Sequence, residues 1–344
     1  MTPAGALGRT VLVSPSWLGD AVLALPAMAA VRAAWPAAHL TVAAPASVAA
    51  LFRETTEVRP DEVIELPGSA RAAVSALAAG RHDLAILFPN SFGSAWRARQ
   101  AGVGERWGYR TAGRRWLLTR HAARPPARLA PHMRDYYCAL VGAFGIPVAE
   151  ESVPHLAATP RSLEAADRLL GGRRASRLVV IAPGAAYGQA KQWPPARLAE
   201  VVARLVAAGD VTCAIVGAPH DRSAARAIES WLRAEAPAAW PAVIDLVGRT
   251  SVGVLAGVAA RADVFVSNDS GAMHVAAALG RPVVALFGPT DERATGPLGA
   301  HDVLTEPVFC RPCGLRDCPI DHRCMTRLTV DRVAAVVADR LQAG

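Results

Sequence analysis

A cluster of small polar residues marks a place in this sequence where an anion could bind. The stretch that contains it runs from residue 267 to residue 290 and reads SNDSGAMHVAAALGRPVVALFGPT. The pattern predicts a buried strand over 262–266, a tight polar turn, a helix over 271–279 and a second strand over 282–287. The turn therefore lies between the carboxyl end of a strand and the N-terminus of a helix.

The residues of this turn suit a diphosphate. Backbone N–H groups and the positive end of the helix dipole attract negative charge, and Gly271 lets a ligand approach the backbone closely. Ser270 can donate a hydroxyl, and His274 lies about one turn further along the same helix face. Alternatively, Asp269 or Ser270 only caps the helix. Because open parallel sheets bind ligands at the carboxyl ends of their strands, we favour the diphosphate site.

A carboxylate at the tip of the first strand–helix connection could act as a base. The predicted strand over 10–14 continues into SPSWLGD, which ends at Asp20 and leads into an alanine- and leucine-rich helix. A carboxylate in this position can accept a proton from a sugar hydroxyl as that hydroxyl attacks. Capping of the helix is the other interpretation, and the residue types alone do not separate the two.

One lysine is unusual because the chain otherwise uses arginine for positive charge. Lys191 lies in the loop PGAAYGQAKQWP, residues 183–194, and is the only lysine among 37 lysines and arginines. Its compact ammonium group suits a diphosphate leaving group where a planar guanidinium would not fit. The alternative is an ordinary surface lysine. The loop follows a predicted strand over 177–182, so it also begins at the carboxyl end of a strand.

The net charge of +8 falls within one segment. Residues 97–128 contain nine arginines and a single acid, Glu105, and Trp96, Trp107 and Trp116 alternate with these arginines. Nucleic-acid-binding proteins show such mixtures, but no RNA- or DNA-binding signature accompanies this one, so we expect no nucleic acid partner. An anionic glycolipid or a membrane surface would be attracted by the same charge. A solvated arginine-rich surface is the third interpretation.

The elements that must position these residues form two similar halves. In the first half, alanine-rich helices separate predicted strands over 10–14, 40–44, 63–66 and 84–88. The pattern begins again with predicted strands over 177–182, 212–216, 243–247, 264–267 and 283–286. This alternation predicts an α/β protein with doubly wound parallel sheets, and 344 residues are enough for two domains. No GxGxxG motif follows the first strand, which argues against a dinucleotide-dependent dehydrogenase.

The sequence contains no signal for export or membrane insertion. Its first thirty residues lack a basic leader followed by an unbroken apolar run, and no stretch approaches the length of uninterrupted apolar sequence that crosses a bilayer. We therefore expect a cytoplasmic location.

Five blocks of the sequence, taken in order, resemble glycosyltransferase family 9. They are PSWLGD at 15–20, PNSF at 89–92, PGAAYGQAKQWP at 183–194, GAPHD at 217–221 and NDSGAMHVAAAL at 268–279. Within that family the blocks are most similar to ADP-heptose:lipopolysaccharide heptosyltransferases of the heptosyltransferase II type. The resemblance implies a GT-B fold, in which two Rossmann-like domains with parallel sheets face each other across a cleft.

The same resemblance implies domain boundaries and an activity. It implies an acceptor-binding domain over 1–155, a nucleotide-sugar-binding domain over 156–328, and a C-terminal helix over 329–344 that would pack back on the N-terminal domain. The implied reaction is the inverting transfer of L-glycero-D-manno-heptose from ADP-heptose to the first heptose of the lipopolysaccharide inner core. Alternatives are another donor or acceptor within the family, a GT-B nucleotide-sugar epimerase, and a non-catalytic sugar-nucleotide-binding protein. An anionic, lipid-linked acceptor implies peripheral contact with the inner face of the cytoplasmic membrane.

Individual roles follow from the resemblance as well. Asp20 would be the general base, and Lys191 would stabilise the departing diphosphate. The residues implied for the nucleotide sugar are Gly184, Asp221, Asp269, Ser270, Gly271 and His274, with Asp221 at the adenosine ribose. The residues implied for the acceptor are Asn90, Ser91, Arg97, Arg114 and Arg115. The chain has no Asp-x-Asp motif, so we expect that the reaction requires no metal cofactor.

A group of cysteines near the C-terminus departs from the pattern expected of the family. Cys310, Cys313, Cys318 and Cys324 lie within fifteen residues, with His322 among them. This spacing suits a structural zinc ion or an iron–sulfur cluster, whereas free or redox-active thiols are the alternative. A cytoplasmic location disfavours structural disulfides.

Overall fold

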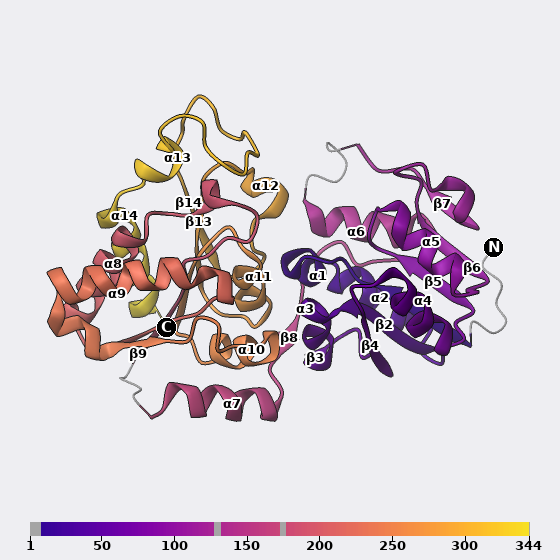
Figure 1. The fold of residues 1–344 in the computed structure, drawn as a ribbon, viewed down its shortest axis with the longest axis horizontal. Helices are drawn as coiled ribbons and strands as arrows, with labels where there is room; N and C mark the ends of the chain where they lie inside the picture. The colour runs from indigo at the N-terminus through magenta and orange to yellow at the C-terminus, as the bar shows by residue number, and fades with distance from the viewer. Residues whose placement is uncertain (1–7, 127–131, 173–176, 344) are drawn as a thin grey trace. The chain divides into compact units, whose positions relative to one another are not determined.

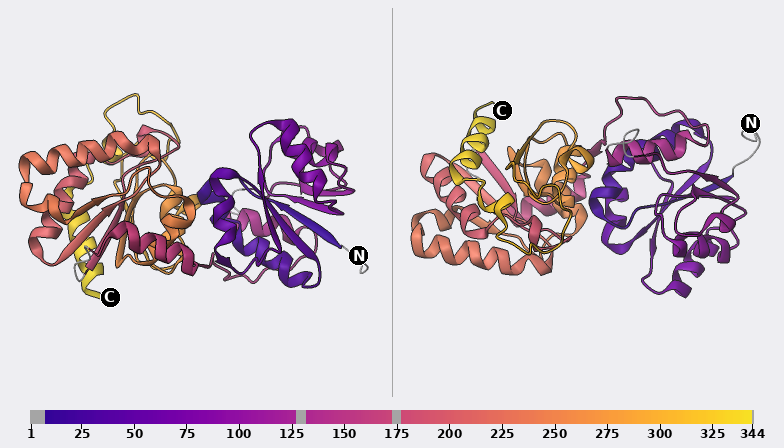
Figure 2. Two further views of the ribbon diagram at one scale, coloured as in Figure 1. Left: turned by 60° about the horizontal axis from the view of Figure 1, so that its bottom comes forward. Right: turned by 90° about the horizontal axis from the view of Figure 1, so that it is seen from above.

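The computed structural model describes residues 8–126, 132–172 and 177–343. The chain forms two compact units, Met1–Leu156 and Ala157–Gly344. Each unit contains one six-stranded sheet with helices on both of its faces (Figures 1 and 2). Sheets covered in this way bury both faces of their strands, which explains why runs of Val, Leu, Ile and Ala form the central strands here.

The sheet of the first unit has the strand order β4-β2-β1-β5-β6-β7, and all its neighbouring strands are parallel. In β1, Leu12 lies opposite Val42 of β2 on one side and Ile86 of β5 on the other. The strands are β1 Arg9–Val13, β2 His39–Pro45, β4 Glu62–Leu66, β5 Leu84–Leu87, β6 Glu105–Tyr109 and β7 Arg120–Ala122. The helices are α1 Leu18–Leu23, α2 Leu25–Ala34, α3 Ala46–Ala49, α4 Ala70–Ala79, α5 Phe92–Gln100 and α6 Met133–Gly142, with short 3₁₀ turns η1 Ala50–Arg53 and η2 Arg115–Leu117.

The sheet of the second unit has the order β11-β10-β9-β12-β13-β14 and is also parallel throughout. Its strands are β9 Arg177–Ala182, β10 Val211–Ile215, β11 Val243–Asp245, β12 Val264–Asn268, β13 Val283–Phe287 and β14 His301–Thr305. Its helices are α7 Pro160–Leu170, α8 Pro195–Ala208, α9 Arg222–Glu235, α10 Val252–Ala260, α11 Gly271–Ala278, α12 Glu292–Thr295, α13 Arg323–Thr326 and α14 Val330–Ala343. The 3₁₀ turns are η3 Gln189–Lys191, η4 Pro219–Asp221 and η5 Pro237–Ala242.

A separate two-stranded sheet joins β3 Thr55–Thr56 with β8 Leu156–Ala157.

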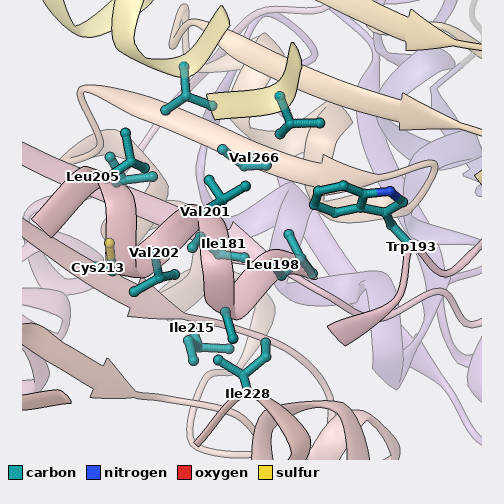
Figure 3. Close-up of a cluster of buried hydrophobic side chains, with 14 of the residues drawn as sticks. Ile181, Trp193, Leu198, Val201, Val202, Leu205, Cys213, Ile215, Ile228 and Val266 are labelled. Atoms are coloured by element: carbon teal, nitrogen blue, oxygen red, sulfur yellow. The ribbon is translucent and has the colours of Figure 1, made fainter. Parts of the chain in front are cut away.

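Each face of the second sheet has its own hydrophobic core, because side chains alternate along a strand. From β9, Val179 and Ile181 enter the core beneath α8 and α9, whereas Leu178 and Val180 enter the core beneath α7 and α10. The first of these cores includes Trp193, which is fully buried beside Leu198 of α8 (Figure 3). Its indole Nε1 donates to the carbonyl oxygen of Leu328 at 3.2 Å. Trp193 therefore fixes the end of the loop that carries the single lysine.

The C-terminal helix belongs to the second unit. Thr329 accepts a hydrogen bond from the backbone N–H of Arg332 at 3.3 Å and so caps α14. Val333 and Val337 are fully buried in the same core as α8. The apolar stripe of α14 completes the core of the second unit, and the expected packing of this helix against the N-terminal domain stays a prediction.

The strands predicted from apolar runs are all present, with ends shifted by at most two residues. The strands β6, β7 and β14, which lie at or next to the edges of the two sheets, were not predicted from the sequence. Edge strands carry more polar residues, and β6 reads Glu-Arg-Trp-Gly-Tyr, without the apolar run that marks a central strand. Part of the basic segment therefore forms the edge of the first sheet.

Candidate active site

In the second unit, Asn268 connects the lysine-bearing loop to the polar turn. It is the last residue of β12 and is 1% exposed. Its side-chain Oδ1 accepts from the backbone N–H of Trp193 at 3.0 Å, and its Nδ2 donates to the carbonyl oxygen of Pro183 at 2.6 Å. Both ends of the loop 183–193 are thus bonded to one carboxamide. This role of Asn268 was not predicted from the sequence, because asparagine is common in turns.

Lys191 is held by a buried carboxylate. Its Nζ lies 2.5 Å from Oδ2 of Asp269, and the two side chains are only 12% and 5% exposed. Thr290, which follows β13, donates its hydroxyl to the same oxygen at 2.5 Å. The ammonium also lies 4.8 Å from the centroid of the Tyr187 ring. Lys191 is therefore not an ordinary surface lysine, since a buried charge of this kind requires a partner.

The N-terminus of α11 has no side-chain cap. Ser270 occupies the cap position with extended backbone angles, but its hydroxyl does not bond to the first turn of the helix. That hydroxyl lies 3.0 Å from Oγ of Ser267, and Asp269 is engaged with Lys191 and Thr290. The capping interpretation of the turn therefore does not apply. Gly271 begins the helix and His274 is 5% exposed on it, so the positive end of the dipole lies beside the lysine–aspartate pair.

Asp221 is packed between two glycine loops. Its Oδ2 accepts from the backbone N–H of Ala218 at 2.9 Å. A Cβ on Gly184 would lie 2.1 Å from Oδ1 of Asp221, and a Cβ on Gly217 would lie 2.9 Å from Oδ2. Both glycines are therefore required to make room for the carboxylate. In these contacts Asp221 holds together the loops that follow β9 and β10, and its contact with a ribose stays a prediction.

In the first unit, Asp20 is bonded to a buried tyrosine. Asp20 lies in the first turn of α1, where the helix dipole favours a carboxylate. It forms a side-chain hydrogen bond with Tyr137 of α6, whose hydroxyl is the donor. The pKa of Tyr137 is raised well above its usual value, mainly because the side chain is buried and also because the Asp20 carboxylate lies nearby. Tyr137 therefore remains a protonated donor that orients Asp20, a role that was not predicted from the sequence.

Asn90 and Ser91 lie together at the carboxyl end of β5. The side-chain Nδ2 of Asn90 donates to the hydroxyl of Tyr136 at 2.7 Å. Ser91 caps α5 by accepting from the backbone N–H of Ser94 at 3.2 Å. Thr111 donates to the carbonyl oxygen of Asn90 at 2.9 Å, so the loop is fixed from two directions.

Arg114 does not face the solvent, and its predicted role in acceptor binding is wrong. The side chain is 0% exposed. Its guanidinium donates to the carbonyl oxygens of Tyr109, Pro89 and Ser91 and to Oγ of Ser94. Burial lowers the pKa of Arg114 to about 10. The guanidinium thus binds the 89–94 loop from inside the first unit.

The signal that could have separated Arg114 from its neighbours is a glycine in β6. A Cβ on Gly108 would lie 3.0 Å from Nη2 of Arg114. A glycine within a strand often indicates that another group approaches the backbone closely. The adjacent Arg115 is exposed, with its Nε 3.2 Å from Nε2 of His121, and Arg97 is half-buried in the last turn of α5.

Three exposed aromatic rings lie close to one another next to the loop 89–94. Phe92 stacks on Trp96 with ring centroids 6.2 Å apart and lies 5.9 Å from Trp116. The exposed fractions are 40%, 40% and 60% respectively. The guanidinium of Arg99 lies 5.6 Å from the Trp116 ring. We call Phe92, Trp96, Trp116 and Arg99 the aromatic–arginine patch.

The cysteine group does not form a metal centre in the part of the chain that the structure describes. Among these residues, no group of three or more His, Cys, Asp or Glu side chains is arranged to hold a metal ion. Cys313 and Cys318 are exposed, whereas Cys324 is buried. Burial first, and then the neighbouring thiols of Cys310, Cys318 and Cys313, raise the pKa of Cys324. Of the interpretations left open by the spacing, the structural zinc site therefore has no support in this geometry.

None of the helices in the described residues is both long enough and apolar enough to cross a membrane.

Comparisons with known proteins agree with this geometry. The sequence profile of glycosyltransferase family 9 (heptosyltransferase) matches residues 70–322. Lipopolysaccharide heptosyltransferase 2 of Salmonella typhimurium is 33% identical over 307 residues, covering 84% of this chain and 85% of that protein. The Escherichia coli K12 protein of the same name is 32% identical with the same coverage.

The fold agrees with a solved relative. The structure of E. coli ADP-heptose lps heptosyltransferase II matches with a TM-score of 0.84 and 28% identity, covering 97% of this chain and 99% of that one. The predicted fold class, an α/β protein of the GT-B type with parallel sheets, is therefore confirmed.

Proposed function

Because the chain belongs to glycosyltransferase family 9 and is a glycosyltransferase, we propose that it transfers a heptose from ADP-heptose to the lipopolysaccharide inner core. The sugar would be L-glycero-D-manno-heptose, and the acceptor would be a hydroxyl of the first heptose of the core. The anomeric configuration would invert. One observation carries this proposal, namely the buried Lys191–Asp269 pair beside the uncapped N-terminus of α11.

The donor diphosphate would bind at this pair. Lys191 supplies a compact positive charge, and the N–H groups that begin α11, which the side chain of Ser270 does not cap, supply hydrogen-bond donors. Asp269 holds the ammonium in place, while Ser270 and Gly271 form the edge that the phosphate oxygens would contact. Gly184, Asp221 and His274 would line the rest of the nucleotide-sugar site.

The chemistry follows from where charge develops. The acceptor oxygen forms a bond to the anomeric carbon as the bond from that carbon to the diphosphate oxygen breaks. The bonding electrons leave with ADP, and Lys191 with the α11 N-terminus stabilises the added negative charge. Asp20 accepts the proton of the acceptor hydroxyl. Tyr137 orients the Asp20 carboxylate by donating a hydrogen bond to it.

The acceptor would bind to the first unit. Asn90 and Ser91 are fixed at the carboxyl end of β5, and Arg97 and Arg115 lie in the segment that carries the excess positive charge. A phosphorylated or carboxylated core would be attracted by these arginines. Replacing both by Gln should raise KM for the acceptor and weaken its salt dependence, while leaving the constants for the donor unchanged.

The aromatic–arginine patch would contact the inner face of the cytoplasmic membrane. Exposed Trp and Phe rings favour the headgroup region of a bilayer, and adjacent arginines favour anionic lipids. Vesicles of phosphatidylglycerol and phosphatidylethanolamine should therefore sediment the protein, and the double replacement Trp96→Ser with Trp116→Ser should reduce the bound fraction. Phe309→Ser is the matched control, because Phe309 is 80% exposed in the second unit with Arg323 near its ring. Equal binding by the double variant and the unaltered protein would exclude this patch.

Acceptor-dependent release of ADP tests the proposed function. We expect ADP to appear when ADP-heptose and a core acceptor carrying one heptose are both present, and to appear far more slowly without the acceptor. An epimerase would convert the sugar nucleotide without any acceptor, and a binding protein would retain it unchanged. Either of these outcomes would contradict the proposal.

A further inference from the structure

The cysteine-bearing segment contacts both stretches of chain that hold the lysine–aspartate pair. We call residues 310–324 the cysteine loop. It contacts the turn 187–191, which carries Lys191, and it also contacts the turn 288–292, which carries Thr290. Metal or redox chemistry of the cysteines does not account for the contacts of this segment with the donor site, so these contacts require another explanation.

The cysteine loop forms three hydrogen bonds with the turn 187–191. The hydroxyl of Tyr187 donates to the carbonyl oxygen of Gly314 at 2.9 Å. The backbone N–H of Ala190 donates to the carbonyl oxygen of Arg316 at 2.9 Å. Nε2 of His322 lies 2.6 Å from the carbonyl oxygen of Ala190. Since a carbonyl can only accept, this nitrogen carries the proton of the imidazole.

The fit between the two segments is close. A Cβ on Gly188 would lie 2.4 Å from the carbonyl oxygen of Arg316, so only glycine fits at this position. The guanidinium of Arg316 lies 5.1 Å from the centroid of the Tyr187 ring, against which Lys191 also packs. The turn cannot move without breaking contacts with the cysteine loop.

Arg311 holds the other turn. Its Nε donates to the carbonyl oxygen of Gly288 at 2.7 Å, and its Nη2 donates to the carbonyl oxygen of Thr290 at 3.0 Å. The same guanidinium pairs with Glu292 at 2.5 Å, and its side chain is only 12% exposed. The planar guanidinium presents its N–H donors in a fixed fork, so it can make all these bonds together. The backbone N–H of Gly314 adds a bond of 2.8 Å to the carbonyl oxygen of Pro289.

We propose that the cysteine loop positions the donor site, with Arg311 and His322 as its positioning residues. Asp269 is fixed by β12, but its two partners, Lys191 and Thr290, stand on turns that the loop holds from outside. Arg311 acts through the backbone of Thr290, and His322 acts through the backbone of Ala190, the residue before Lys191. This inference deepens the proposed function, since it names the element that sets the geometry of the diphosphate site.

Two measurements on four variants test this proposal. The variants are Arg311→Gln, His322→Ala, His322→Gln and the control Arg323→Gln. Gln at position 322 can place an amide N–H close to where Nε2 lies, so it should restore the bond to Ala190. Arg323 is a matched control because it pairs with Asp321 inside the same segment.

Hydrogen exchange tests the contacts without any ligand. In Arg311→Gln, peptides covering 288–292 should exchange at least tenfold faster, and in His322→Ala the same should hold for peptides covering 187–191. His322→Gln and Arg323→Gln should exchange like the unaltered chain. Unchanged exchange in both Arg311→Gln and His322→Ala would overturn the proposal whether or not the protein binds ADP-heptose.

The affinity for ADP, measured by calorimetry, tests the consequence for the donor site. We expect the Kd to rise at least tenfold in Arg311→Gln and His322→Ala, with less than a twofold change in the other two variants. KM for the acceptor should stay constant. Kd values within twofold of the control, or donor and acceptor constants that move together, would show that the loop does not position the donor site. Absence of ADP binding by the unaltered chain would instead contradict the proposed function, and exchange alone would then decide whether the loop holds the two turns.

Discussion

Replacement of Lys191 by Met separates the charge of this side chain from the packing of its stem. Met keeps a long unbranched side chain beside Tyr187 but removes the ammonium that lies 2.5 Å from Oδ2 of Asp269. The carboxylate, only 5% exposed, then retains the hydroxyl of Thr290 as a donor but has no counter-charge. Removal of one partner from a buried ion pair costs about 3–5 kcal/mol of stability. We expect a cost at the lower end of this range, because Thr290 remains.

A second replacement restores stability but not activity. In Lys191→Met with Asp269→Asn, the buried charge is gone and the amide oxygen still accepts from Thr290, so most of the lost stability should return. The transition state, however, still lacks its positive charge. Loss of one such electrostatic group lowers kcat by roughly a hundredfold to a thousandfold, or about 2.7–4 kcal/mol. We therefore expect the double variant to be stable and nearly inactive.

Urea unfolding at neutral pH and acceptor-dependent ADP release are the two assays. Arg204→Gln is the control for stability, because its pair with Asp331 is exposed to solvent and should contribute little to the free energy of unfolding. Recovery of normal turnover in the double variant would refute the catalytic role of Lys191. If Lys191→Met changed the free energy of unfolding no more than Arg204→Gln does, the claim that Lys191 and Asp269 form a buried ion pair would be refuted.

Four further predictions concern the base, the basic segment, the thiols of Cys138 and Cys213, and metals. Asp20→Asn should lower kcat roughly a hundredfold or more with little change in donor affinity, and near-normal turnover would remove Asp20 from the mechanism. Arg114→Gln should lower the free energy of unfolding by roughly 3 kcal/mol, whereas exposed Arg115→Gln should leave it unchanged; equal effects in urea unfolding would contradict the burial of Arg114. Burial raises the pKa of Cys138 to about 11 and that of Cys213 to about 12, so both bind their protons more tightly in the folded state, and stability should fall between about pH 9 and pH 12. Cys213→Ala should reduce that fall in urea unfolding, and an unchanged slope would contradict it. Dialysis against EDTA should leave acceptor-dependent ADP release unchanged, and its loss with recovery by added metal would show a metal requirement.

The central architecture could be predicted because burial leaves a signal in the sequence. The strands β1, β2, β5, β9, β12 and β13 are apolar runs, and a parallel sheet buries both faces of such runs. The polar turn after β12 was also predictable, since the carboxyl end of a strand and a following glycine are both visible in the sequence. Edge strands such as β6 and β7 carry no such run and were missed.

The partners of the site residues could not be predicted in the same way. Lys191 and Asp269 are distant in sequence, and Asp20 pairs with Tyr137 from another helix, so only the fold brings them together. Arg114 was expected at the acceptor site because the sequence shows how many arginines a segment contains but not which of them is buried. The contacts of Arg311 were not predicted either, because the cysteine spacing in its segment indicated only metal or redox chemistry.

Analysis of the product by mass spectrometry and NMR tests the central claim most directly. The unaltered protein is incubated with ADP-heptose and a core acceptor that carries one heptose, alongside Asp20→Asn. We predict that the acceptor gains one heptose residue with inverted anomeric configuration, that ADP forms in equal amount, and that Asp20→Asn yields almost no product. An acceptor of unchanged mass after complete consumption of ADP-heptose, or a product with retained configuration, would contradict this account.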